Sequence, residues 1–90
     1  MMAKWVIEDE AHSEWQGEFD TLSGALAELR RRAEIPWDQE PNQAPCQSWR
    51  TCGRRYEIIE FDATELPWRE LSRTLALEIS ASATKWHSAP

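Results

Sequence analysis

The residues best suited to bind another molecule lie in one proline-rich segment, residues 36 to 47, and just after it. There two indoles stand among carboxylate, amide and guanidinium groups, and the prolines restrict the backbone. An apolar wall with a few orienting polar groups is typical of a ligand pocket. We expect the residues that contact a ligand or partner to be Trp37, Asp38, Asn42, Trp49 and Arg50. The same composition also fits a loop pinned to the domain by its ring and its Asn hydrogen bonds, which is the more common arrangement.

The chain has two cysteines, Cys46 and Cys52. With His12 and His87 they make a nominal set of four zinc ligands, but there is no close pair of cysteines or of histidines, as zinc sites usually have. A disulfide is disfavoured in a reducing compartment, and no sequence feature places a histidine beside a thiol as a catalytic base. We therefore expect buried thiols, without a metal or a cofactor.

Motifs for catalysis are missing. Ser23-Gly24 lacks the pattern of a nucleophile elbow, and neither a Gly-rich phosphate loop nor a metalloprotease motif occurs. Glu57 and Glu60 lie on a predicted strand, where solvation and arginine partners explain carboxylates better than acid–base chemistry does. Five arginines are expected to pair with acids instead of forming an anion site: Arg50, Arg54, Arg55, Arg69 and Arg73. We expect no catalytic residue.

Length and charge limit the class of protein. Ninety residues suit one domain, residues 1 to 90, with one modest core. A net charge of -6 argues against binding to phosphate backbones, which needs an excess of Lys and Arg. The sequence has no run of the roughly 18 apolar residues that cross a bilayer, and its first residues do not resemble a secretory signal. We expect a cytoplasmic protein that binds neither nucleic acid nor membrane.

The first third predicts a hairpin followed by a helix. Residues 4 to 10 and 14 to 20 alternate as strands, with Trp5 facing the core from the first strand. On the second strand Trp15, Gly17 and Phe19 are expected to share the core face, opposite a wet acidic face of Glu14, Gln16, Glu18 and Asp20. An apolar stripe then predicts a helix on the sheet: Leu22, Ala25, Leu26, Leu29 and Ala33. Thr21 is its expected N-cap, and three arginines suit its last turn.

The remaining elements complete an α+β fold. Strands are expected at residues 48 to 52 and 55 to 62, the latter central or bulged because Ile58 and Ile59 make both of its faces apolar. Residues 67 to 71 are expected to form a short helical turn, and residues 74 to 81 a strand. The predicted fold is an antiparallel sheet of four to five strands with one main helix packed on one face, in the order β-β-α-β-β-β.

A resemblance adds an expectation about origin. The residues that carry it are Pro36-Trp37-Asp38, Pro41-Asn42, Ala44-Pro45-Cys46, Trp49, Cys52-Gly53-Arg54 and Tyr56-Glu57-Ile58-Ile59. In these positions, and over much of its length, the chain resembles small uncharacterised bacterial proteins, some of them carried on mobile gene cassettes. The resemblance implies a bacterial accessory gene and brings no activity or site residue with it.

Three functions stay open from the sequence. The favoured one is a non-catalytic binding or interaction module that contacts a protein or small-molecule partner or pairs as a homodimer, since an open antiparallel sheet leaves edges to cover. The second is a small-molecule-binding protein or small enzyme with residues 37 to 50 as its pocket. The third is an acidic inhibitor or nucleic-acid mimic that uses the acidic hairpin face.

Overall fold

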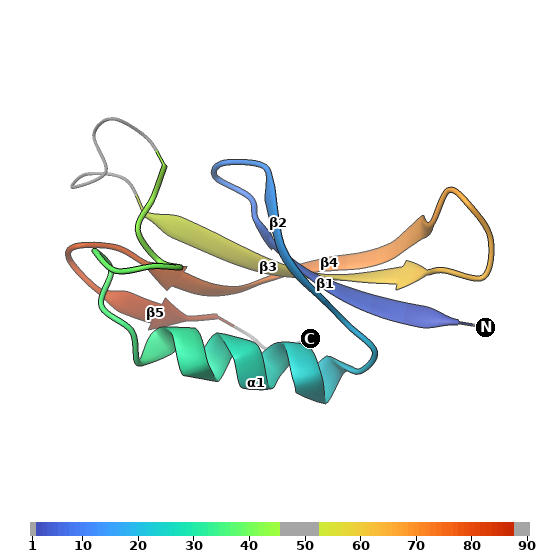
Figure 1. Ribbon diagram of the computed structural model, residues 1–90, viewed down its shortest axis with the longest axis horizontal. Helices are drawn as coiled ribbons and strands as arrows, with labels where there is room; N and C mark the ends of the chain where they lie inside the picture. Colours follow the sequence, from blue (N-terminus) through green and yellow to red (C-terminus); the bar gives the residue numbers. More distant parts are fainter. Residues whose placement is uncertain (1, 46–52, 88–90) are drawn as a thin grey trace.

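The computed structural model describes residues 2 to 45 and 53 to 87. Figure 1 shows one helix lying against one face of an antiparallel sheet. The sheet has five strands in the order β2-β1-β3-β4-β5. The elements are β1 (Ala3–Asp9), β2 (Glu14–Phe19), α1 (Leu22–Ala33), β3 (Arg54–Asp62), β4 (Arg69–Ile79) and β5 (Thr84–Trp86). The predicted α+β class, with a single helix on one sheet face, is confirmed.

Helix α1 begins and ends where its sequence predicts. The hydroxyl of Thr21 accepts a hydrogen bond from the backbone N–H of Gly24 at 3.0 Å, which satisfies one of the N–H groups that a helix start leaves unpaired. Ala25 and Leu29 are fully buried against the sheet. The last turn holds three arginines, whose charge opposes the negative end of the helix dipole.

The core lies between α1 and the sheet. Tyr56 and Ile58 of central strand β3 pack there with Leu77 of β4, and all three are at most 1% exposed. Trp5 packs on the edge of this core, as its strand phase predicts. Burying a large apolar side chain contributes about 1.5 to 3 kcal/mol, so these contacts hold the two layers together. Ile59, on the other face of β3, is also fully buried, which agrees with the two-sided apolar pattern of this strand.

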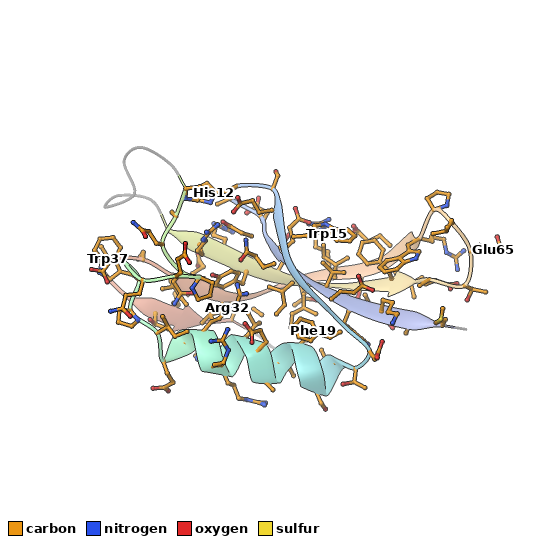
Figure 2. All side chains as sticks on the ribbon, in the orientation of Figure 1. His12, Trp15, Phe19, Arg32, Trp37 and Glu65 are labelled. Carbon is orange, nitrogen blue, oxygen red and sulfur yellow. The ribbon has the colours of Figure 1, made fainter. Side chains whose placement is uncertain are left out.

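A β-bulge corrects the expected phase of β2. Ile7 pairs with Gly17, but the next residue of β1, Glu8, pairs with Trp15, so β2 carries one extra residue at this point. The extra residue reverses the side-chain alternation on one side of the bulge. Phe19 therefore points toward α1, whereas Trp15 lies on the opposite side of the sheet (Figure 2). The prediction that Trp15 shares the core face with Phe19 is wrong.

The last third of the chain differs from its prediction in two elements. A single strand, β4, covers Arg69–Ile79, so the helical turn expected at residues 67 to 71 is wrong. Pairing with β3 along the whole of β4 satisfies backbone groups that a short helical turn leaves open. The brief strand β5 was not predicted, because its Thr84-Lys85-Trp86 sequence is too short for a pattern. The strand expected at residues 48 to 52 lies outside the described residues.

Candidate functional site

Of the five residues predicted to bind a ligand, the structure describes Trp37, Asp38 and Asn42. Trp49 and Arg50 lie outside the described residues. Trp37 is half-buried against the helix-side core, and Asp38 is exposed. A shallow hollow beside Trp37 is lined also by the β4–β5 turn, and it includes neither Asp38 nor Asn42. The described part of the loop thus does not bring these three side chains into one pocket.

Asn42 is occupied in holding the loop to the end of α1. Its amide nitrogen Nδ2 donates to the carbonyls of Arg32 at 2.9 Å and Ile35 at 2.8 Å. Its Oδ1 accepts from the hydroxyl of Tyr56 at 3.0 Å. With 1% of its surface exposed, Asn42 has the full hydrogen bonding that a buried amide requires. These contacts fit the pinned-loop interpretation, and a ligand contact for Asn42 stays a prediction.

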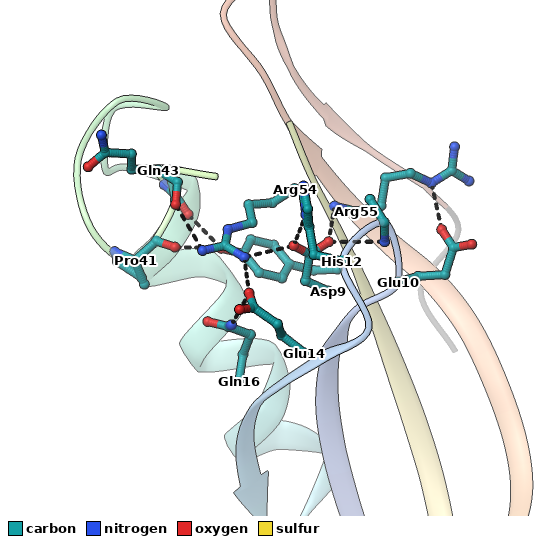
Figure 3. Close-up of polar contacts among 12 residues, drawn as sticks. Asp9, Glu10, His12, Glu14, Gln16, Pro41, Gln43, Arg54 and Arg55 are labelled. Carbon is teal, nitrogen blue, oxygen red and sulfur yellow. Dashed lines mark hydrogen bonds and ion pairs between the residues drawn. The ribbon is translucent and has the colours of Figure 1, made fainter. Parts of the chain in front are cut away.

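Next to this loop, Arg54 of β3 forms a buried ion pair with Asp9 of β1 (Figure 3). Its Nη1 lies 2.8 Å from Asp9 Oδ2 and 2.5 Å from Glu14 Oε1, while Nη2 donates to the carbonyl of Gln43 at 2.8 Å. Burial opposes the charge of Arg54, but the hydrogen bonds to both carboxylates outweigh it and raise the pKa of the guanidinium above its usual value. Arg54 therefore links β3 to β1, to β2 and to the loop that carries Gln43.

Asp9 is the centre of the polar contacts around Arg54. It is fully buried, and its Oδ2 also lies 2.6 Å from His12 Nδ1. Its Oδ1 accepts from the backbone N–H groups of Ala11 and Arg55, each at 3.1 Å. A carboxylate with this many donors is satisfied inside the fold, so the cluster is structural.

Arg32 of α1 forms a second set of polar contacts, on the helix side of the sheet. Its Nη1 donates to Gln16 Oε1 at 3.0 Å, and its guanidinium lies 5.1 Å from the ring centroid of Tyr56. Because Gln16 turns toward Arg32 and Glu14 toward Arg54, the expected wet face of Glu14, Gln16, Glu18 and Asp20 is wrong. Only the last two of the four are exposed.

A first prediction concerns Glu28, whose carboxylate accepts from Arg31 and from Arg32 on α1. The two hydrogen bonds from Arg31, followed by the one from Arg32, lower the pKa of Glu28 from 4.5 to about 2. A lowered folded-state pKa contributes stability that is present above pH 4.5 and is lost as the pH falls toward 2. We expect Glu28→Gln to remove about 1 to 2 kcal/mol of that pH-dependent stability, because solvent screens part of the pairing. Urea denaturation of both proteins across this acid range measures the effect, and parallel stability curves would contradict it.

The sheet face that α1 leaves uncovered carries an apolar cluster, here called the aromatic patch, in which Phe61 is buried and the other members are exposed or partly exposed. Its members come from β2, β3 and the β3–β4 connection: Trp15, Phe61, Leu66, Pro67 and Trp68. They line a shallow open hollow of about 430 Å³. The patch is remote from the predicted loop, since Trp37 and the β3–β4 connection that holds Glu65 lie at opposite ends of the molecule (Figure 2).

The rings of the aromatic patch hold one another in place. The Trp15 ring centroid lies 5.6 Å from that of Phe61 and 6.3 Å from that of Trp68, within the range of favourable aromatic pairs. Beneath them Val6 and Ile59 are fully buried. Trp15 itself is 55% exposed. A large ring is thus fixed in position with half of its surface open to solvent.

A charged group, the Arg73 cluster, borders the aromatic patch. Arg73 Nη1 donates to Oε1 of Glu8 at 3.1 Å and of Glu57 at 2.8 Å, and its Nη2 donates to Oε1 of Glu70 at 2.9 Å. The hydrogen bond to Glu70, followed by that to Glu57, raises the pKa of Arg73 above its usual value. Three carboxylates around one guanidinium give the cluster a net charge of -2.

Within residues 2 to 45 and 53 to 87 no group of three or more His, Cys, Asp or Glu side chains is arranged to hold a metal, and Cys46 and Cys52 lie outside that part. The four arginines Arg54, Arg55, Arg69 and Arg73 are paired with carboxylates, as expected.

The sequence analysis did not predict the aromatic patch, although one feature of the sequence indicated it. Ile58 and Ile59 make both faces of β3 apolar, whereas the sequence supplies a helix for only one.

Comparison of the chain with protein-family models, with curated proteins and with solved structures finds no match. The resemblance to cassette-borne bacterial proteins therefore stays a prediction. Among the described residues no helix has the length and apolar character needed to cross a membrane.

Proposed function

We propose that this chain is a non-catalytic interaction module that docks a partner protein on the uncovered sheet face, through the aromatic patch. The observation that carries the proposal is Trp15, a ring 55% exposed yet fixed by contacts with Phe61 and Trp68. Beside it Leu66 is 86% exposed. Contiguous exposed apolar surface marks interaction sites, and tryptophans contribute disproportionately to binding energy there.

The shape of the aromatic patch supports a protein partner over a small substrate. Small ligands bind in concave pockets that enclose most of their surface, whereas the hollow beside Trp15 and Trp68 is shallow and open. Its rings lie over buried Val6 and Ile59, which gives the surface a rigid base. A rigid aromatic surface loses little side-chain entropy on binding, so it suits a flat protein contact.

The test is selection of short random peptides, displayed on phage, on the immobilised protein. We expect selected peptides to bind Trp15→Ala at least about tenfold more weakly than the wild type, because the ring supplies central contact area. Trp86→Ala is the matched control, since Trp86 is 46% exposed on β5, outside the aromatic patch. Its peptide binding should equal that of the wild type.

Thermal melting accompanies this test, and we expect both Trp variants to remain folded because each ring is about half exposed. Leu66→Ser repeats the experiment at a position 86% exposed, where the fold depends little on the side chain. Selected peptides that bind Trp15→Ala and Leu66→Ser as tightly as the wild type would exclude the aromatic patch as the site. A selection that yields no binder would count against an interaction module.

The other functions predicted from the sequence remain alternatives. The homodimer has an available edge, because among the described residues the β5 segment pairs with β4 from Ala76 to Ile79 and leaves the rest of that edge of β4 open. The ligand pocket at residues 37 to 50 includes residues outside the described part of the chain. The acidic inhibitor or mimic loses its continuous hairpin face, since Glu14 is engaged with Arg54.

A further inference from the structure

We infer that the partner segment recognised by the aromatic patch is cationic: an extended stretch of polypeptide with Arg or Lys next to an apolar side chain. The inference rests on the proposed function and adds the chemistry of the partner. It follows from the position of the Arg73 cluster beside the aromatic patch and from the net negative charge of that cluster.

The strand register places carboxylates directly beside the exposed ring. On β1, Glu8 lies opposite Trp15 of β2, and on its other side it lies opposite Glu57 of β3. Residues directly opposite in antiparallel strands have their Cβ atoms about 4.5 to 5.5 Å apart. Trp15, Glu8 and Glu57 therefore form a row across the sheet. A segment with an apolar side chain on Trp15 has its neighbouring side chains above the two carboxylates.

The carboxylates in this row are only partly neutralised. Arg73 bonds the Oε1 atom of Glu8, Glu57 and Glu70, and within the described structure no hydrogen bond reaches any of their Oε2 atoms. Two glutamates directly opposite each other repel, and one guanidinium between them offsets this only in part. The side chain of Glu70 is 44% exposed and those of Glu8 and Glu57 are each 14% exposed, so a second cation reaches Glu70 most directly and gains charge-assisted hydrogen bonds with oxygens that are already in place.

A second ion-pair group lies on the same face. Arg55 alternates with Tyr56 and Ile58 and so shares the uncovered face with Glu57. Arg55 lies 3.1 Å from Glu10 and 3.5 Å from Glu78, and Lys85 of β5 lies opposite Glu78, so the charges of this group balance. His87 also contacts Glu78, at 2.6 Å. The unbalanced negative charge beside Trp15 therefore belongs to the Arg73 cluster.

Charge complementarity distinguishes between the kinds of molecule that can cover this apolar face. A second copy seated face to face would oppose two clusters of charge -2, in molecules that each carry a net charge of -6. Phosphate backbones and anionic lipid surfaces are repelled for the same reason. A cationic segment is attracted, and its Arg or Lys gains further energy by lying over the Trp15 ring. Arg suits the site best because its planar fork matches two carboxylate oxygens.

The experiment compares two displayed peptide libraries of the same design on the intact protein. One offers Lys and Arg without Asp and Glu, and the other offers Asp and Glu without Lys and Arg, with the same apolar and polar residues elsewhere. We expect binders that depend on Trp15 from the cationic library only. Their affinity should fall by about tenfold in Glu8→Gln/Glu57→Gln and should weaken with added salt.

Glu34→Gln/Glu40→Gln is the matched control, because it changes the net charge equally at two exposed positions remote from the aromatic patch. Its peptide affinity should stay within about twofold of the wild type. Binders that depend on Trp15 but come equally from both libraries, or keep their affinity in Glu8→Gln/Glu57→Gln, overturn the cationic partner and leave the proposed function standing. A concentration-dependent dimer that Trp15→Ala abolishes assigns the face to a second copy and overturns the inference. Binders that ignore Trp15 overturn both.

Discussion

Arg54→Met is expected to lower the free energy of unfolding by about 3 to 5 kcal/mol, the cost of removing one partner of a buried ion pair. Asp9 is 0% exposed and Arg54 is 7% exposed, so water cannot replace the lost contact. The substitution also removes the hydrogen bonds of the guanidinium to Glu14 and to the carbonyl of Gln43. Methionine keeps most of the apolar stem, so the loss reports the polar contacts. Urea denaturation measures it as a lower midpoint.

The matched control is the next residue, Arg55. It makes ion pairs with Glu10 and Glu78, but its side chain is 48% exposed. We expect Arg55→Met to cost no more than about 1 kcal/mol, the usual contribution of a surface ion pair. Arg54→Lys, which keeps the charge and loses the fork, should fall between the two and provides a folded variant if Arg54→Met does not fold. Equal midpoints for the two methionine variants would contradict a structural role for the buried pair.

The sequence correctly predicts the elements that are determined by residues close together in the chain. Helix α1 was located because its apolar stripe, its Thr21 cap and its basic last turn all act within a few residues. A central or bulged β3 was predicted from Ile58 and Ile59, sequence neighbours that point to opposite faces of the strand, and β3 is the middle strand of the sheet with both side chains buried. In each case the residues that determine the structure are the residues of the element itself.

The predictions that are wrong concern features that depend on contacts between residues distant in the sequence. The face of Trp15 depends on a bulge that forms between β1 and β2, and the Glu14 to Phe19 pattern alternates regularly without it. The extent of β4 depends on its pairing with β3, whereas Trp68, Leu71 and Leu75 also fit one helical face. Neither the inserted residue nor the partner strand is visible in a short window of sequence.

The candidate site, too, is built from residues that are distant in the sequence. The ion pair of Asp9 and Arg54 joins residues 45 positions apart, and only the β1–β3 register brings them together. The aromatic patch likewise combines a hairpin ring with residues of the β3–β4 connection. What the sequence did contain was a mismatch between two apolar sheet faces and one helix. That mismatch indicates an uncovered face, but it does not say which rings occupy it.

Asn42→Ala is expected to lower the free energy of unfolding by about 2 to 3 kcal/mol, because it leaves buried polar groups without partners. The carbonyl of Ile35 loses its amide donor and the hydroxyl of Tyr56 loses its 3.0 Å acceptor, whereas the carbonyl of Arg32 keeps the backbone N–H of Ile35 at 3.0 Å. The same hydroxyl lies 3.4 Å from the carbonyl of Pro41, a longer contact that replaces only part of the loss. Urea denaturation gives the size of the effect.

The neighbouring residue separates the pinned loop from a ligand pocket. Gln43 is exposed and contributes its backbone carbonyl, not its side chain, to the contact with Arg54. We expect Gln43→Ala to change stability by less than about 0.5 kcal/mol. Asn42→Asp keeps an acceptor for Tyr56 but sets a carboxylate against two carbonyls, so it should destabilise at least as much as Asn42→Ala. If both Asn42 variants unfold at the wild-type midpoint, the buried amide is not what holds the loop, and ligand contact regains support as the reason for its position.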